Sequence, residues 1–159
     1  MLSFLDEINP KDDNFVVLHL KGSHFNYENR YPESFAKEHG LRTDGGDVEC
    51  YRNSIRYTDY VLERIYSYAK QKLNLQSMIY FSDHGGIPDM RRSPRFLGFK
   101  MVRIPLWTYL SDEYRKQHAG VAEALKANSD RYFTNDLVYE LVCGILDVLS
   151  NRYDRTQSI

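Results

Sequence analysis

An aspartate and a histidine, Asp83 and His84, follow the apolar residues 78–82 and precede two glycines. A short apolar run that ends at glycine is typical of a buried strand, and in open α/β sheets ligands bind just beyond the carboxyl ends of the strands. A carboxylate oxygen and an imidazole nitrogen together suit Zn²⁺ or Mn²⁺, and glycine lets the backbone come close to a ligand. The types and position of these residues indicate half of a metal site.

A second histidine, His24, follows another apolar run, residues 15–20, in the loop Gly22-Ser23-His24. If the two runs form neighbouring parallel strands, both histidine-bearing loops lie at the same edge of the sheet. The alternative is that Asp83 caps a turn and that both histidines are ordinary polar loop residues. The spacing alone leaves both interpretations open.

Strand patterns alternate with helix patterns along the chain, which indicates a mostly parallel sheet covered by helices. We expect strands at residues 15–20, 78–82 and 101–107, and Pro105 either makes the third an edge strand or ends it. Apolar residues at helical spacing predict a helix over residues 48–72, which Asp47 is placed to cap.

Two further helical stretches are expected in the C-terminal third of the chain. Ser111 opens a short one, and residues 134–136 open another, whose apolar face extends to Leu149. The polar residues 151–159 are expected to form a frayed tail.

The composition limits the classes of function. A chain of 159 residues fits one domain, residues 1–159, and a net charge of −1 provides no basic field for nucleic acid. The chain has no apolar run of the ~20 residues that cross a bilayer and no signal-peptide pattern at its start, so we expect a soluble chain. Cys50 and Cys143 lie in different predicted helices without metal-ligand spacing, so we expect two buried thiols.

Four sequence blocks, in order, carry a resemblance to a known family. They are residues 17–24 with Tyr31-Pro32 after them, residues 51–59, residues 80–85, and residues 104–106 with Leu110-Ser111. With these blocks the chain resembles the catalytic domain of the sulfatase-like phosphoethanolamine transferases of the alkaline phosphatase superfamily. The resemblance implies a three-layer α/β sandwich with a mostly parallel sheet, of which this chain is the C-terminal portion.

The resemblance also implies an activity. Such a domain transfers or hydrolyses a phosphoethanolamine, phosphate or sulfate ester on a cell-envelope glycan or lipid, through a covalent intermediate and with Zn²⁺, or Mn²⁺ or Mg²⁺, as cofactor. Asp83 and His84 match the family's zinc ligands, and His24 matches a residue that contacts the phosphoryl group or a second metal. His19 occupies a strand position, and we expect a hydrogen-bonded core histidine there.

Three departures from the family pattern limit what the resemblance implies. Gly86 stands where the family usually has glutamate, and no histidine lies between Gly86 and Ile104. Arg91 and Arg92 in that stretch provide guanidinium groups that bind phosphate or sulfate oxygens, or else form a solvated basic loop. No threonine has the strand-to-helix context that the nucleophile needs, so we expect the nucleophile outside this chain.

The expected partners and location follow from the same comparison. The substrates would be a phospho- or sulfo-ester, such as phosphatidylethanolamine, and an envelope glycan or lipid at the periplasmic face of the inner membrane. If the protein is split, the N-terminal half of the catalytic domain would be a further partner. The alternative function is a non-catalytic, truncated α/β domain that acts in binding or in self-association as a homodimer.

Overall fold

A computed structural model describes residues 2–88 and 98–158 of the chain. The chain forms two compact units, Met1–Asn74 with His84–Arg103 and Leu75–Asp83 with Ile104–Ile159. The peptide bond between Asp83 and His84 therefore joins one unit to the other. The expectation of a single domain over residues 1–159 stays a prediction.

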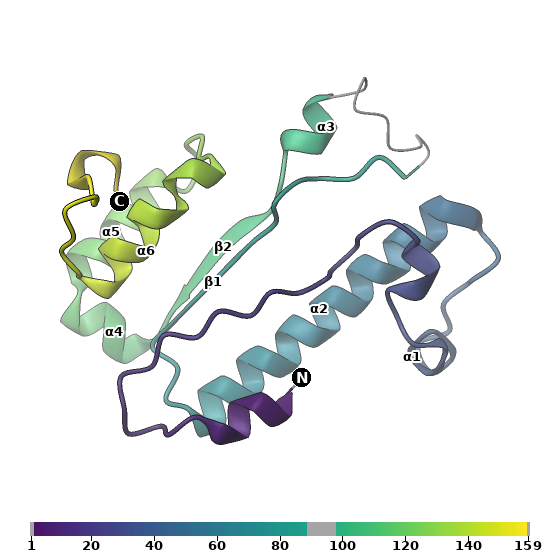
Figure 1. The fold of residues 1–159 in the computed structure, drawn as a ribbon, viewed down its shortest axis with the longest axis horizontal. Coiled ribbons are helices and arrows are strands. Elements are labelled where there is room, and N and C mark those ends of the chain that lie inside the picture. The colour runs from purple at the N-terminus through teal and green to yellow at the C-terminus, as the bar shows by residue number, and fades with distance from the viewer. Residues whose placement is uncertain (1, 89–97, 159) are drawn as a thin grey trace. The chain divides into compact units, whose positions relative to one another are not determined.

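The helix α2, Gly46–Lys72, is the longest element of the first unit (Figure 1). It confirms the helix predicted at residues 48–72, but its N-cap is Gly45, so the prediction of Asp47 as the cap is wrong. Asp47 and Glu49 lie inside the first turn, where their carboxylates interact favourably with the helix dipole. Lys70 and Lys72 stand at the opposite end, where positive charge is favoured.

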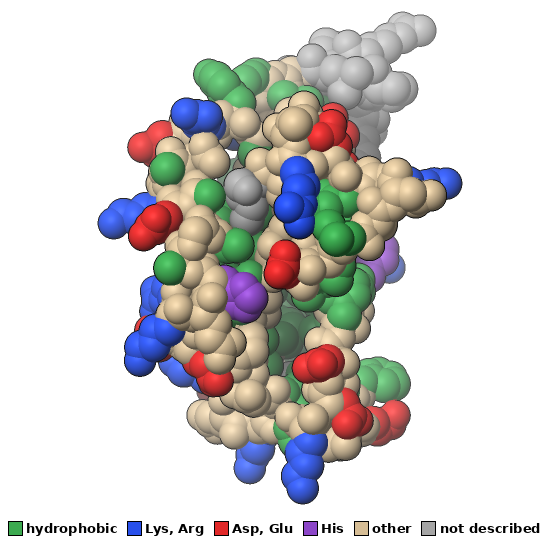
Figure 2. Space-filling model, turned by 90° about the vertical axis from the view of Figure 1, so that its left-hand side faces the viewer, with side chains coloured by type: hydrophobic (Ala, Val, Ile, Leu, Met, Phe, Trp, Pro, Cys, Tyr) green, Lys and Arg blue, Asp and Glu red, His purple; other side chains and the backbone are tan. Residues whose placement is uncertain are grey.

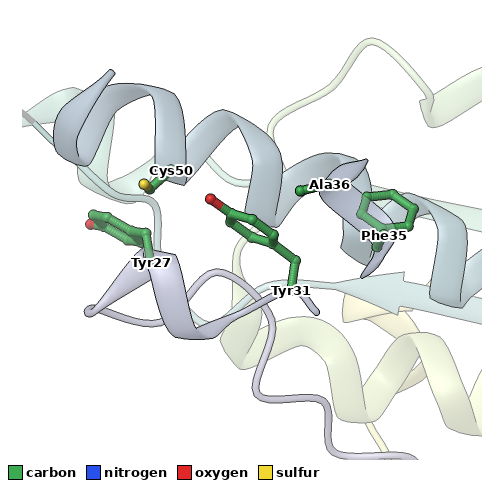
Figure 3. Packing of buried hydrophobic residues seen from close by; sticks show 5 residues of the cluster. All are labelled: Tyr27, Tyr31, Phe35, Ala36 and Cys50. Atoms are coloured by element: carbon green, nitrogen blue, oxygen red, sulfur yellow. The ribbon is translucent and has the colours of Figure 1, made fainter. Parts of the chain in front are cut away.

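Short elements of the N-terminal segment pack on this helix. They are the 3₁₀ helices η1, Leu2–Glu7, and η2, Tyr27–Asn29, and the helix α1, Glu33–Glu38. The core that η2 and α1 form with α2 is aromatic, and Figure 3 shows the rings of Tyr27 and Tyr31 lying against the Cys50 turn of α2. Its buried members are Tyr27, Tyr31, Phe35, Ala36 and Cys50.

A fully buried asparagine, Asn53, lies beside this core and has its polar groups paired. Its amide nitrogen donates to the carbonyl oxygen of Arg42 at 2.6 Å and to the hydroxyl of Tyr31 at 3.4 Å. Burial raises the pKa of that hydroxyl above its usual range. Because a buried amide is costly unless it is hydrogen-bonded, these contacts hold the loop before α2 against the helix.

The strand predicted at residues 15–20 is absent. These residues have no regular secondary structure, and Phe15, Val16, Val17 and Leu18 are exposed. A strand exists only when its backbone groups pair with a neighbour, and no strand of the described residues pairs with this run. The expected core position of His19 is wrong for the same reason, because the histidine is exposed on the unpaired run.

The sheet of the second unit contains the strands β1, Ser77–Phe81, and β2, Leu106–Leu110. The first confirms the strand predicted at residues 78–82. The two strands pair antiparallel, with Ser77 opposite Leu110 and Phe81 opposite Leu106, so the parallel arrangement expected for them is wrong (Figure 1). Antiparallel pairing needs no crossover connection, and the chain reverses its direction between the strands.

The third strand was predicted at residues 101–107, but the observed strand begins and ends later in the sequence. The helix α3, Phe99–Val102, occupies its first residues, and β2 begins just after Pro105. Proline cannot donate a hydrogen bond to the ladder, so it marks the start of β2 and not its end.

Helices pack against this hairpin in the second unit. The short helix predicted at Ser111 is α4, Asp112–Gln117, and Ser111 caps it, because its hydroxyl accepts from the Tyr114 amide at 2.9 Å. The helix α5, Ala119–Asn128, is rich in alanine and was not predicted. The hydrophobic core joins the hairpin to these helices and to α6, Val138–Leu146, and its buried residues are Leu110, Tyr114, Leu141 and Ile145.

The C-terminal helix is shorter than predicted. The 3₁₀ helix η3, Asn135–Leu137, leads into α6, which ends at Leu146, so Leu149 lies beyond the helix and is 76% exposed. Residues 155–157 form the 3₁₀ helix η4, and the Ser158 hydroxyl donates to the Glu140 carbonyl at 3.0 Å, while the expected fraying of residues 151–159 stays a prediction. Cys50 and Cys143 are free, buried thiols, as expected.

The stability of the second unit is expected to fall in alkaline solution. The buried Tyr114 hydroxyl donates to the Ile145 carbonyl at 2.5 Å, and burial, with the Asp147 carboxylate, raises its pKa above the usual 10.0. As the pH rises through the usual tyrosine pKa, the unfolded chain loses the phenolic proton of Tyr114 before the folded chain does, so unfolding becomes more favourable.

Urea unfolding followed between about pH 9 and pH 11 measures this effect. Tyr114→Phe should be less stable than wild type at neutral pH by about 1–3 kcal/mol, because a buried carbonyl loses its donor, but it should lose less stability on alkalinisation. Tyr132→Phe is the matched control, since Tyr132 is 100% exposed. An identical alkaline loss in wild type and Tyr114→Phe would contradict the prediction.

Candidate functional site

The candidate site begins where β1 ends. The last strand residue is Phe81, and Asp83 and His84 follow it with exposed side chains. The structure therefore places the pair at the carboxyl end of a strand, as the sequence predicted. The turn from Asp83 to Gly86 is held by contacts from three other segments.

The imidazole of His84 is oriented by its own turn. Its Nδ1 lies 2.7 Å from the carbonyl oxygen of Gly85. A carbonyl oxygen can only accept a hydrogen bond, so this contact requires the proton on Nδ1. The lone pair of the neutral ring is then on Nε2, and a backbone carbonyl that fixes the tautomer in this way is a common feature of metal-binding histidines.

Gly85 lies in close contact with the turn of α3. Its amide donates to the Met101 carbonyl at 2.6 Å, and a Cβ atom at this position would lie 2.4 Å from the Lys100 carbonyl oxygen. Any side chain at residue 85 would therefore collide with backbone. The glycine allows α3 to approach the turn that carries His84.

The space beside Gly86 is limited by a side chain and not by backbone. A Cβ atom there would lie 3.2 Å from Cε2 and 3.4 Å from the hydroxyl oxygen of Tyr51, a half-buried residue of α2. The Tyr51 ring is itself supported edge-on by Tyr27, with 5.0 Å between the ring centroids. The aromatic ring thus occupies the space beside residue 86, where the family pattern has a glutamate side chain.

Asn135 contacts the start of the turn and was missed as a site residue by the sequence analysis. Its amide nitrogen donates to the carbonyl oxygens of Ser82 at 3.0 Å and Asp83 at 3.3 Å. The sequence placed residues 134–136 at a helix start and contains no signal for a contact with residues 53 positions away.

His24 lies in an exposed turn of the first unit. Gly22 in this turn has φ +50°, a left-handed conformation that glycine adopts readily, and the Arg30 guanidinium donates to the carbonyls of His24 at 3.0 Å and Phe25 at 3.1 Å. Across residues 2–88 and 98–158, no three His, Cys, Asp or Glu side chains group closely enough to hold a metal. The joining of His24 to Asp83 and His84 stays a prediction.

Arg91 and Arg92 lie outside the described residues. On the face shown in Figure 2, acidic and basic side chains are interspersed and not gathered by sign. Of the helices in residues 2–88 and 98–158, none combines the length and apolarity needed to cross a membrane.

The comparison with protein families gives the chain its class. The sulfatase family model matches residues 1–142, a range that includes parts of both units and the whole turn from Asp83 to Gly86. The chain therefore belongs to the sulfatase family, and the resemblance inferred from the sequence blocks is confirmed. Membership implies an α/β fold of the alkaline phosphatase type.

Individual relatives share a more particular name. The Kdo(2)-lipid A phosphoethanolamine 7''-transferase of Escherichia coli K12 is 32% identical over 159 residues, which cover 89% of this chain and 28% of the relative. The protein of the same name from Salmonella typhimurium is 31% identical, covering 77% and 24%. Phosphoethanolamine transferase EptA of Escherichia coli K12 is 25% identical, covering 95% and 31%.

The chain thus spans less than a third of the length of these relatives. No solved structure matches it significantly.

The close packing at Gly85 can be tested by adding one methyl group. Gly85→Ala should lower the free energy of unfolding by about 1–3 kcal/mol, because the new Cβ must displace the α3 backbone. Urea unfolding of the purified protein measures the change.

Gly98→Ala is the matched control, since Gly98 has an ordinary φ of −103° and a Cβ there meets nothing within 4 Å. Equal stability of the two variants would show that α3 does not contact Gly85 as described.

Proposed function

We propose that this chain is part of a metal-dependent domain that transfers phosphoethanolamine. The observation that carries the proposal is the match to the sulfatase family over residues 1–142 together with relatives named phosphoethanolamine transferases. The proposed acceptor is an envelope glycan or lipid, and the proposed donor is a phosphoethanolamine ester such as phosphatidylethanolamine. Hydrolysis of a phosphate or sulfate ester is the variant reaction that the same family supports.

Asp83 and His84 would hold the metal. Their donor set, one carboxylate and one imidazole whose Nδ1 donates to a carbonyl, fits Zn²⁺, and Mn²⁺ or Mg²⁺ are the alternatives. When bound, the metal supplies Lewis acidity that favours a deprotonated nucleophile and stabilises negative charge on the phosphoryl oxygens. Two side chains leave a tetrahedral ion incomplete, so we expect weak metal affinity in this chain.

The remaining groups would act on the substrate. His24 is proposed to contact the phosphoryl group or a second metal, and Arg91 and Arg92 to bind its oxygens. The nucleophile of the covalent intermediate is proposed to come from outside this chain, from the N-terminal part of the catalytic domain. The proposed location is the periplasmic side of the inner membrane, where such lipids and glycans are accessible.

Zinc binding is the direct test of the metal proposal. In calorimetric titration the wild-type chain should bind Zn²⁺, and Asp83→Ala and His84→Ala should each weaken binding by about tenfold or more, because each removes one of two protein ligands. Circular dichroism of each variant checks that the fold is retained.

His19→Ala is the matched control, because it removes an exposed histidine elsewhere in the chain. Equal binding by wild type and by the Asp83→Ala and His84→Ala variants would mean that the pair only forms a turn.

Self-association is the second candidate function, and one observation favours it. Four consecutive apolar residues, Phe15 to Leu18, are exposed, and Val17 is 75% exposed. Their backbone belongs to no sheet of the described residues. An exposed apolar run without a ladder is suited to antiparallel pairing with the same run of a second copy, which would form a symmetric homodimer.

Light scattering at increasing protein concentration tests this association. We expect the mass of a dimer for the wild type and of a monomer for Val17→Asp, because a carboxylate in the paired run would be buried without a partner. Val102→Asp is the matched control on α3, where Val102 is 65% exposed. A wild-type monomer at every concentration would exclude the homodimer.

A further inference from the structure

The carboxamide of Asn135 joins two backbone carbonyls at the end of β1. Its nitrogen donates to Ser82 at 3.0 Å and to Asp83 at 3.3 Å, and all three residues belong to the same compact unit. Residue 82 is the first after the strand, so these carbonyls follow directly on the β1–β2 ladder. Asn135 therefore replaces the hydrogen-bond partners that β2 no longer provides.

The amide of Asn135 holds this orientation at a cost. Since both carbonyl oxygens only accept, the nitrogen must face them, and the Oδ1 atom is then turned into the protein. There it is buried and accepts no hydrogen bond from the described residues. A buried oxygen that accepts no hydrogen bond has lost its interaction with water and gained nothing in return. Asn135 keeps this orientation although its Oδ1 is unsatisfied. This indicates that the two hydrogen bonds of its nitrogen, to the carbonyls of Ser82 and Asp83, have a role.

We propose that Asn135 is a positioning residue for Asp83, an inference that rests on the proposed metal-binding function. The backbone dihedrals of residues 82 and 83 decide in which direction the Asp83 carboxylate leaves the strand. These two carbonyl oxygens belong to the two peptide units that flank the Asp83 Cα, so fixing both of them limits the φ and ψ angles of Asp83. Groups that do not touch the metal but hold a metal ligand in its orientation contribute strongly to metal affinity.

The substitution Asn135→Asp tests this with little change of shape. It replaces the amide donor by a carboxylate, which repels both carbonyl oxygens. Zinc affinity measured by calorimetry should fall by about tenfold or more. An added negative charge alone would strengthen the binding of a cation, so a fall reports the displacement of Asp83. The carbonyl ¹³C shifts of Ser82 and Asp83, measured without metal, should move in the same variant.

Asn151→Asp is the matched control, because it makes the same chemical change at an exposed residue of the same unit. Neither the zinc affinity nor the two carbonyl shifts should change in this variant. Zinc affinity in Asn135→Asp equal to that of the wild type would overturn the proposal.

A direct measurement in the wild type covers the case in which Asn135→Asp does not fold. Through-hydrogen-bond coupling between the Asn135 side-chain nitrogen and the Ser82 carbonyl carbon should be detectable, and its absence would overturn the proposal. If the wild type binds no zinc, the proposed metal function fails, and unchanged carbonyl shifts in the metal-free variant would then refute the positioning role separately.

Discussion

The β1–β2 ladder is the interaction on which the candidate site depends. Its register pairs Phe81 with Leu106 and ends there, so the backbone beyond Phe81 must find other hydrogen-bond partners. Asn135 provides them for the first two carbonyls, and Met101 accepts from the amide of Gly85. The place where the ladder ends is therefore the place where Asp83 and His84 emerge, and tertiary contacts hold the turn that carries them.

The two glycines after His84 show how packing sets the chemistry of this turn. At residue 85 the α3 backbone fills the space of a side chain, and at residue 86 the Tyr51 ring would lie in tight contact with a Cβ atom. That ring packs edge-on against Tyr27, so a side chain at residue 86 would require a small shift within the aromatic cluster. Across residues 2–88 and 98–158, no three His, Cys, Asp or Glu side chains group closely enough to hold a metal.

The sulfatase family match and the exposed run at residues 15–18 both concern the size of the sheet. A family match over most of the chain implies an α/β domain, whereas the sheet of the described residues has two strands. The relatives are more than three times as long as the matched region. The apolar residues Phe15 to Leu18 are exposed, and they lie a few positions before His24, the residue that the resemblance matches to a phosphoryl contact.

The sequence by itself determined the elements whose signals are local. The helical period of α2, the apolar run of β1, the Ser111 cap of α4 and the blocks that identify the family all lie within short stretches, so they could be recognised without knowledge of the fold. The expected position of Asp83 and His84 at a strand end has the same origin. These features depend on backbone propensity and on side-chain periodicity, which a linear pattern records.

Only the tertiary structure decided the antiparallel pairing, the unpaired state of residues 15–20, and the contacts of Asn135 and Tyr51. A strand requires a partner, and an apolar run has the same sequence whether or not a partner is present. Asn135 meets residues 53 and 52 positions away, and Tyr51 meets a glycine on a distant loop. Contacts of this kind leave no periodic signal in the chain, because they depend on which surfaces folding brings together.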